Sequence, residues 1–170
     1  MLDLRLRDVP TNADIERFAA QNPGYRFERD VDGTLVVSPT GSAGGLRNAR
    51  LVAALFAWNE SLSQPGFCFD SSTGFALTDG SLISPDAAWI AHDRWTALTD
   101  DEREGYAPLV PDIVVEIASK TDRPAALRRK LVRCRLLGAA YVVFLDPFRN
   151  EHWSDGVAPE GLRRTLCTIR

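Results

Sequence analysis

Two periods of apolar and polar residues run through this sequence, and they predict which segments form helices and which form strands. Apolar residues three and four positions apart predict helices over residues 11–24, 44–62 and 121–139. Asn12 is the expected N-cap of the first helix, because short polar side chains there satisfy free backbone N–H groups. Thr121 or Asp122 is the expected N-cap of the third helix.

Short apolar or alternating segments predict strands between these helices. A hairpin is expected over residues 25–39, with a two-residue turn at Asp32 and Gly33, because Asp-Gly favours tight hairpin turns. The other expected elements are strands at residues 66–70, 73–77, 81–91, 112–118 and 140–147 and a short helix within 92–105. Near the C-terminus, residues 150–156 and 163–170 are interpreted as a closing hairpin.

The segment from residue 112 to 146 combines a strand, a helix and a second strand. Both strands are apolar without alternation, which indicates burial on both faces of a sheet. A strand-helix-strand unit of this kind predicts a parallel pair with a right-handed crossover, whereas the hairpins add antiparallel neighbours. The sequence therefore predicts an α/β (α+β) fold, with a mixed β-sheet flanked by helices in one domain of 170 residues.

The composition limits the chemistry that this domain can carry. Three widely spaced cysteines and two histidines make a zinc site or a disulfide framework improbable, so each cysteine is interpreted as a small buried apolar residue. A net charge of -3 is not that of a general nucleic-acid binder, although a metal site must itself be acidic. No apolar run is long enough to cross a bilayer, and the first ten residues lack a secretory signal, so we expect a cytoplasmic protein.

One carboxylate falls inside a strand that is predicted to be buried. Glu116 shares a strand face with Val114 and Ala118, where an ionised carboxylate needs a cation, a metal or a retained proton. At 100° per residue, Lys130 lies on the shoulder of the apolar stripe of the following helix and is directed toward the sheet. A structural ion pair between Lys130 and Glu116 and a catalytic site are equally compatible with this geometry.

A second acid stands at the start of another strand. Asp86 follows Pro85, and an aspartate in such a position is usually only a turn residue. Together with Glu116 and a lysine, however, it supplies what metal-assisted phosphodiester hydrolysis requires. Carboxylates are hard ligands for Mg²⁺, the metal lowers the pKa of bound water, and the ammonium orients that water or stabilises the developing charge.

Three motifs in the second half of the chain resemble one family of proteins. "SPDAAW", "PDIVVEI" and "GAAYVVFLDP" are together similar to the putative restriction endonuclease family of the Uma type, within the PD-(D/E)xK nuclease superfamily. The resemblance covers residues 20 to 155, more weakly in the first part. It implies a restriction-endonuclease-like fold in which Asp86 and Glu116 are the motif acids and Lys130, on the helix, is the motif lysine. Glu28 matches a further recurrent acid and is a candidate additional metal ligand.

The sequence also departs from the family pattern after the glutamate strand. The family usually has Ser-Pro-Ser where this chain has Ser119-Lys120-Thr121, and Lys120 could compete with Lys130 for the active-site role. A second Pro-Asp pair ends in Asp112, which is interpreted as a strand-entry residue because Asp86 matches the motif better.

These observations lead to a first hypothesis and two alternatives. The first is a Mg²⁺-dependent endonuclease, with Mn²⁺ as a substitute, in which the metal is held by Asp86, Glu116, the carbonyl of Ile117 and Glu28, and Lys130 positions water on a DNA phosphodiester. A homodimer is expected because cutting two strands needs two sites. The first alternative is a nuclease fold that binds nucleic acid or protein without cleaving it. The second is a structural pair of Glu116 and Lys130 without a metal site.

Overall fold

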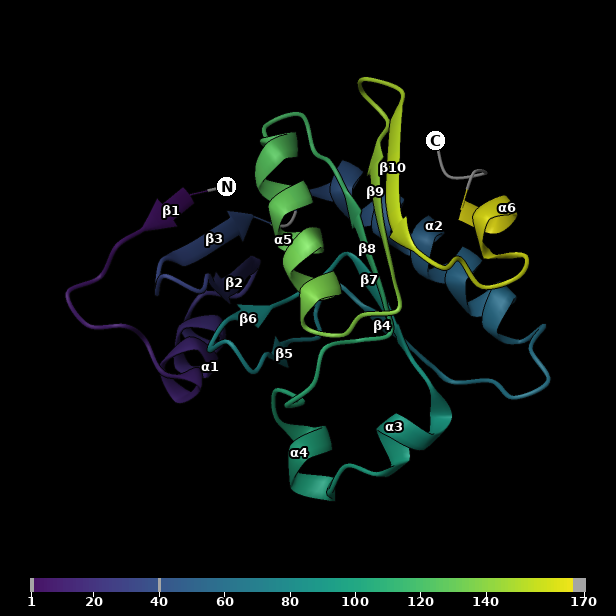
Figure 1. Cartoon of the computed structure of the whole chain (residues 1–170). Helices are drawn as coiled ribbons and strands as arrows, with labels where there is room; N and C mark the ends of the chain where they lie inside the picture. The colour runs from purple at the N-terminus through teal and green to yellow at the C-terminus, as the bar shows by residue number, and fades with distance from the viewer. Residues whose placement is uncertain (1, 40, 167–170) are drawn as a thin grey trace.

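The computed structural model describes residues 2–39 and 41–166, which form two five-stranded β-sheets flanked by helices (Figure 1). The N-terminal sheet has the order β1-β3-β2-β6-β5, and the central sheet has the order β10-β9-β8-β7-β4. The strands of the N-terminal sheet are β1 (Leu2–Leu4), β2 (Tyr25–Arg29), β3 (Leu35–Pro39), β5 (Phe75–Ala76) and β6 (Leu82–Ile83). Those of the central sheet are β4 (Phe67–Asp70), β7 (Ala87–Ile90), β8 (Ile113–Ile117), β9 (Tyr141–Asp146) and β10 (Glu151–Gly156). The helices are α1 (Asn12–Gln21), α2 (Ser42–Asn59), α3 (His92–Thr96), α4 (Asp100–Glu104), α5 (Pro124–Leu136) and α6 (Leu162–Leu166).

The predicted strand-helix-strand unit consists of β8, α5 and β9. β8 and β9 run parallel, with Glu116 opposite Phe144, and every residue of both strands is buried. The other neighbours in the central sheet are antiparallel, so the sheet is mixed, as the sequence predicts. Burial of both faces explains the uninterrupted apolar runs of these two strands.

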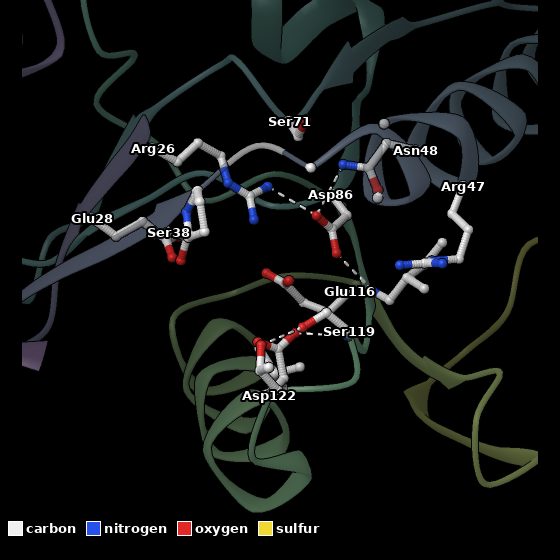
Figure 2. A pocket seen from close by; sticks show the side chains of 17 residues that line it. Arg26, Glu28, Ser38, Arg47, Asn48, Ser71, Asp86, Glu116, Ser119 and Asp122 are labelled. Carbon is white, nitrogen blue, oxygen red and sulfur yellow. Dashed lines mark hydrogen bonds and ion pairs between the residues drawn. The ribbon is translucent and has the colours of Figure 1, made fainter. Parts of the chain in front are cut away.

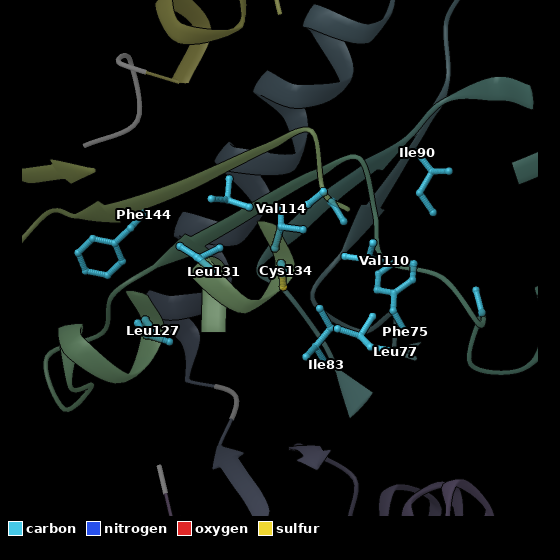
Figure 3. Close-up of a cluster of buried hydrophobic side chains, with 14 of the residues drawn as sticks. Phe75, Leu77, Ile83, Ile90, Val110, Val114, Leu127, Leu131, Cys134 and Phe144 are labelled. Atoms are coloured by element: carbon cyan, nitrogen blue, oxygen red, sulfur yellow. The ribbon is translucent and has the colours of Figure 1, made fainter. Parts of the chain in front are cut away.

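Helices cover the two faces of the central sheet, and each face has its own apolar core. On one side, α5 packs Leu127, Leu131 and Cys134 against Val114 and Phe144 (Figure 3). On the other side, α2 and α6 cover the alternate residues of the same strands; this second core includes Leu51, Leu55, Trp58, Ile113, Val115, Val143 and Leu162. Since strand side chains alternate between faces, Glu116 belongs to the α5 side, together with Val114 and Ala118.

Two local predictions near the N-terminus need correction. The N-cap of α1 is Thr11 rather than Asn12, because Thr11 and Asp14 form a reciprocal capping box that satisfies two backbone N–H groups. The hairpin of β2 and β3 forms, but its turn is wider than two residues. Asp30 N donates to Thr34 O and Gly33 N to Asp30 O, and Gly33 takes a positive φ of 82° that favours glycine.

The C-terminal prediction was wrong. The strand β10 pairs with β9, and residues 163–166, the part of the other predicted strand that the structure describes, belong to α6. Leu162 and Leu166, four positions apart, are both buried in the core beneath α2, and this helical spacing explains the outcome.

Cys134 is buried and Cys68 half-buried, whereas the interpretation of Cys167 lies outside the described residues. Across the part of the chain that the structure describes, no helix is long and apolar enough to span a bilayer.

Candidate active site

A pocket of about 150 Å³ lies between the two sheets and the start of α2 (Figure 2). Its lining residues come from β2, from the first turns of α2, from the start of β7 and from the end of β8. They include Arg26, Glu28, Arg47, Asn48, Asp86, Glu116, Ile117, Ser119 and Asp122. Two acids that the sequence singled out, Asp86 and Glu116, therefore share one cavity, and Glu28 lines it as well.

Asp86 stands immediately before β7 and is held on both carboxylate oxygens. Its Oδ2 accepts a hydrogen bond from the backbone N–H of Ile117 at 2.8 Å. Its Oδ1 accepts from Arg26 Nη1 at 2.9 Å and from Asn48 Nδ2 at 3.2 Å. Its side chain is only 8% exposed. These contacts tie the start of β7 to the end of β8 and fix the orientation of the carboxylate.

Glu116 is the buried carboxylate of β8, and it forms an ion pair with Lys130. Lys130 Nζ lies 2.6 Å from Glu116 Oε1. Burial raises the pKa of the Glu116 carboxyl to about 8; the charge on Lys130 opposes this shift, and the charges on Asp86 and Glu28 add to it. Because a carboxylate here is costly to ionise, any further cation in the pocket would favour its charged form.

Lys130, on α5, contacts two carboxylates from different sheets. Its Nζ lies 2.5 Å from Glu28 Oε1 as well as 2.6 Å from Glu116 Oε1, and its side chain is 13% exposed. Burial alone would lower the pKa of Lys130, but Glu116 and Glu28 outweigh it and raise the pKa above its ordinary value. The ammonium is therefore protonated at neutral pH.

Lys120, the competing lysine, lies elsewhere. It is exposed in the turn after β8, where its Nζ lies 5.9 Å from the centre of the Phe148 ring. The structure thus brings Lys130 rather than Lys120 to Glu116, in the direction that the helical spacing predicts. Asp112, the other aspartate that follows a proline, does not line the pocket either. It accepts from Ala91 N at 2.9 Å and pairs with Arg94 at 2.7 Å, so it fastens the start of β8 to α3.

Glu28 lies beside the predicted site, but one of its oxygens already has two donors. Glu28 Oε1 accepts from the backbone N–H of Ser84 at 2.6 Å and from Lys130 at 2.5 Å. Its contact with Lys130 links β2 of the N-terminal sheet to α5. In this arrangement Glu28 orients the lysine, and only its Oε2 is left for another partner.

Sequence reasoning missed three residues of this pocket. Arg26 lies two positions from Glu28, so the strand period that places both on one face was an available signal. Asn48, on α2, has no comparable signal. Asp122 was expected to cap α5, but the N-cap is Arg123, and Asp122 Oδ2 instead accepts from Ser119 N at 2.8 Å at the pocket wall.

The pocket fits a divalent cation that takes only part of its ligands from the protein. Within residues 2–39 and 41–166, no three His, Cys, Asp or Glu side chains form a group that could hold a metal. Asp86 and Glu116 nevertheless offer two carboxylates at one cavity, and small divalent cations often bind through one or two carboxylates plus water and substrate phosphate. Three acids, Glu28, Asp86 and Glu116, line the pocket together with Arg26 and Arg47. The raised pKa of Glu116 shows that the cations of the chain do not offset the burial of this carboxylate, so a positive ion beside it would favour its charged form.

Comparisons with known proteins agree on one family and one fold. The profile of a family described as Uma2, putative restriction endonuclease, matches residues 13–153. The crystal structure of a putative nuclease belonging to DUF820 from Anabaena variabilis superimposes with a TM-score of 0.64 at 13% sequence identity, covering 92% of this chain and 98% of that one. At this identity the likeness shows the fold, and it confirms the predicted fold class. No curated protein matches the sequence.

Proposed function

Because this chain belongs to the Uma2 family of putative restriction endonucleases, we propose that it is a metal-dependent endodeoxyribonuclease with Asp86, Glu116 and Lys130 as its catalytic residues. The family and the nuclease-like fold support a nuclease. The observation that carries the proposal is the convergence of these side chains from the start of β7, from β8 and from α5. Asp86 and Glu116 line one pocket, and Lys130 reaches Glu116 at 2.6 Å.

Mg²⁺ is the proposed metal, with Mn²⁺ as a substitute. Asp86 and Glu116 would hold it, with the backbone carbonyl of Ile117 and the free oxygen of Glu28 as further ligands. When bound, such an ion supplies positive charge at the phosphate and lowers the pKa of water. The backbone N–H of Ile117 keeps Asp86 in place for this role, because it binds Oδ2 at 2.8 Å.

Lys130 would act as a fixed positive donor rather than as a base. Its raised pKa keeps it protonated at neutral pH, and its two carboxylate partners restrict the position of Nζ. A protonated amine can donate a hydrogen bond to the attacking water or to a phosphate oxygen as negative charge develops there. Glu28 would then be a positioning residue for Lys130.

Two further parts of the proposal concern the substrate and the assembly. Duplex DNA is the proposed substrate, and a homodimer would bring two such sites to its two strands. The apolar side chains of Val132 and Leu136 on the outer side of α5 are 41% and 83% exposed. They are compatible with a contact between two copies, which analytical ultracentrifugation of the purified protein would test.

A second candidate function is a nuclease fold that binds nucleic acid without cleaving it. The engagement of Asp86 favours this candidate, since both of its oxygens already have donors from the chain itself. Three of about four lone-pair sites of this carboxylate are occupied, so an enzyme has only one left for a metal unless it gives up part of the network, whereas a binding module needs none.

Plasmid nicking in the presence of Mg²⁺ or Mn²⁺ separates the two candidates. The wild type is expected to nick supercoiled DNA with either ion and to stop when EDTA is added. Asp86→Ala and Lys130→Met should lose this activity, whereas Lys120→Met, which changes the lysine outside the site, should keep it. DNA binding without any nicking, or nicking that survives Asp86→Ala, contradicts the proposed site.

A further inference from the structure

Arg26 neutralises one of the acids on which the proposed metal site depends. Its guanidinium reaches from β2 of the N-terminal sheet to Asp86 of the central sheet, and Figure 2 shows it directed toward that carboxylate across the pocket. The Arg26 side chain is 24% exposed and that of Asp86 8%, so the ion pair is largely removed from water. The sequence motifs assign no role to this arginine.

The other charges of the pocket explain why Arg26 rests on Asp86. Lys130 is committed to Glu116 and Glu28, at 2.6 and 2.5 Å. Asp86 would otherwise be left with the neutral donors Asn48 and Ile117 N–H. A buried carboxylate without a counter-ion is strongly unfavourable, so Arg26 stabilises Asp86 when the pocket contains no metal ion.

A divalent cation on Asp86 would change this balance. Arg26 Nη1 lies 2.9 Å from Oδ1, and an ion coordinated by that oxygen would compete for the same lone pairs with twice the charge. A guanidinium displaced from Asp86 remains inside the pocket, which Arg26 lines. Glu28 and Glu116 are the other acids that act on it, but Glu28 already binds Lys130 and Glu116 is costly to ionise. The planar fork of donors of the guanidinium matches two oxygens of a phosphate.

We propose that Arg26 is a phosphate-binding residue, which pairs with Asp86 only until a metal ion replaces the guanidinium on that carboxylate. This inference rests on the proposed function and adds to it how the metal and the substrate assist one another. In the metal-free protein, Arg26 pairs with Asp86. With the ion on Asp86, the guanidinium binds the phosphodiester beside the ion.

The exchange makes metal binding and phosphodiester binding cooperative. The metal breaks the pair of Arg26 with Asp86 and so makes the guanidinium available to the phosphate. The phosphate gives the displaced guanidinium a new anion and so reduces the cost of metal binding. Such coupling is reciprocal, and typical values change an affinity by about 5- to 150-fold. A bridge between Arg26 and Asp86 that were only structural would contribute nothing to this coupling.

Calorimetric titration with Mn²⁺ measures the coupling directly, without reliance on activity. The titration is made with and without a duplex oligonucleotide of phosphorothioate linkages, whose intact length is checked on a gel afterwards. For the wild type, the duplex should tighten Mn²⁺ binding by about 5-fold or more. Arg26→Gln should bind Mn²⁺ more tightly than the wild type in the absence of the duplex. The duplex should then tighten Mn²⁺ binding less than in the wild type, because only the direct attraction between ion and phosphate remains. Arg128→Gln is the matched control, because it removes the same charge from a pair with Glu151 outside the pocket and should keep the wild-type coupling.

The possible results separate this inference from the proposed function. If Mn²⁺ binds the wild type and Asp86→Ala abolishes binding, the metal site stands, and an undiminished coupling in Arg26→Gln overturns only the role of Arg26. If the wild type binds no Mn²⁺ at all, both proposals fail. Arg26→Lys keeps the charge and guards against a folding defect in Arg26→Gln. It should restore part of the coupling, and a coupling as weak as that of Arg26→Gln would contradict phosphate binding through this charge.

Discussion

Lys130 Nζ lies 2.5 Å from Glu28 Oε1, although the two residues are 102 positions apart. This contact joins α5, which covers the central sheet, to β2 of the N-terminal sheet. Glu116 shares the same ammonium at 2.6 Å. One lysine therefore neutralises two carboxylates from different sheets, and the position of the proposed catalytic amine depends on how the sheets pack together.

Lys130→Met should destabilise the fold in addition to stopping nicking. It leaves Glu28 without its cation and removes the contact with Glu116, and breaking a buried ion pair by removal of one partner costs about 3–5 kcal/mol. Urea unfolding at pH 7.5 measures the loss. Lys120→Met, in the exposed turn after β8, should change stability by less than about 0.5 kcal/mol. Equal effects of the two substitutions would mean that the contacts of Lys130 contribute nothing to the fold.

Local sequence patterns were sufficient for β8, β9 and α5, but not for residues 81–91. The single strand predicted there was wrong, because β6 and β7 belong to different sheets and Asp86 lies between them. The strands β8 and β9 have uninterrupted apolar runs, and α5 has an apolar stripe whose period fixes the direction of Lys130. These features depend on residues within a few positions of one another. The same holds for Thr11 at α1, where Asp14 three positions later was the unused signal of a capping box.

Long-range pairings were beyond this kind of reasoning. Arg26 and Asp86 meet across 60 positions because the strands of two sheets face one another, and no periodicity within either segment encodes that packing. The division into two sheets depends on β5 and β6, which have two residues each and are too short to show a period. At the C-terminus, Leu162 and Leu166 form only a single helical repeat, which a strand interpretation could equally accommodate.

Packing of α5 against the central sheet should be sensitive to Leu131. This side chain is fully buried in the core between α5 and the sheet, and truncation of a buried leucine to alanine typically costs about 2–5 kcal/mol. Leu131→Ala should therefore lower the free energy of unfolding by that amount in urea titrations. Leu46→Ala, on α2, is the matched control. Its side chain is 56% exposed, so a change within about 0.5 kcal/mol is expected.

The raised pKa of Glu116 predicts that this residue destabilises the metal-free fold as the pH rises. In the unfolded chain the carboxyl ionises near its ordinary pKa of 4.5, whereas in the fold burial holds its pKa near 8. Between these values the unfolded state binds fewer protons than the folded state, so the contribution of Glu116 to stability falls with increasing pH. Glutamine imitates the neutral form at every pH.

The free energy of unfolding of Glu116→Gln should accordingly exceed that of the wild type by an amount that grows from pH 5 to pH 8, with EDTA present. Each unit of pKa shift corresponds to about 1.4 kcal/mol, so a gain of at least that size is expected. Urea unfolding of both proteins at several pH values measures the difference. A difference that stays constant across this range would show that Glu116 is ionised in the fold as readily as in the unfolded chain.

Of the two aspartates that follow a proline, only Asp86 should be needed for a divalent ion to raise the Tm, because Asp112 does not line the pocket. Binding to the folded state alone at 100 times the dissociation constant adds about 2.7 kcal/mol of stability, which raises the Tm of a domain of this size by about 5–10 °C. The wild type should show such a rise with Mn²⁺, and Asp86→Asn should not.

Asp112→Asn is the control. It loses the contacts with Arg94 and Ala91 N–H, so it should start from a lower Tm. It should nevertheless keep the rise, because the Asp112 carboxylate binds residues of α3 and its N-cap and does not line the pocket. A Tm shift that depends on Asp112 instead of Asp86 would place the metal at the N-terminal end of β8, away from Glu116, and would contradict the proposed site. Thermal scans with Mn²⁺ and with EDTA on the three proteins therefore test the metal site by itself, whether or not the protein cleaves DNA.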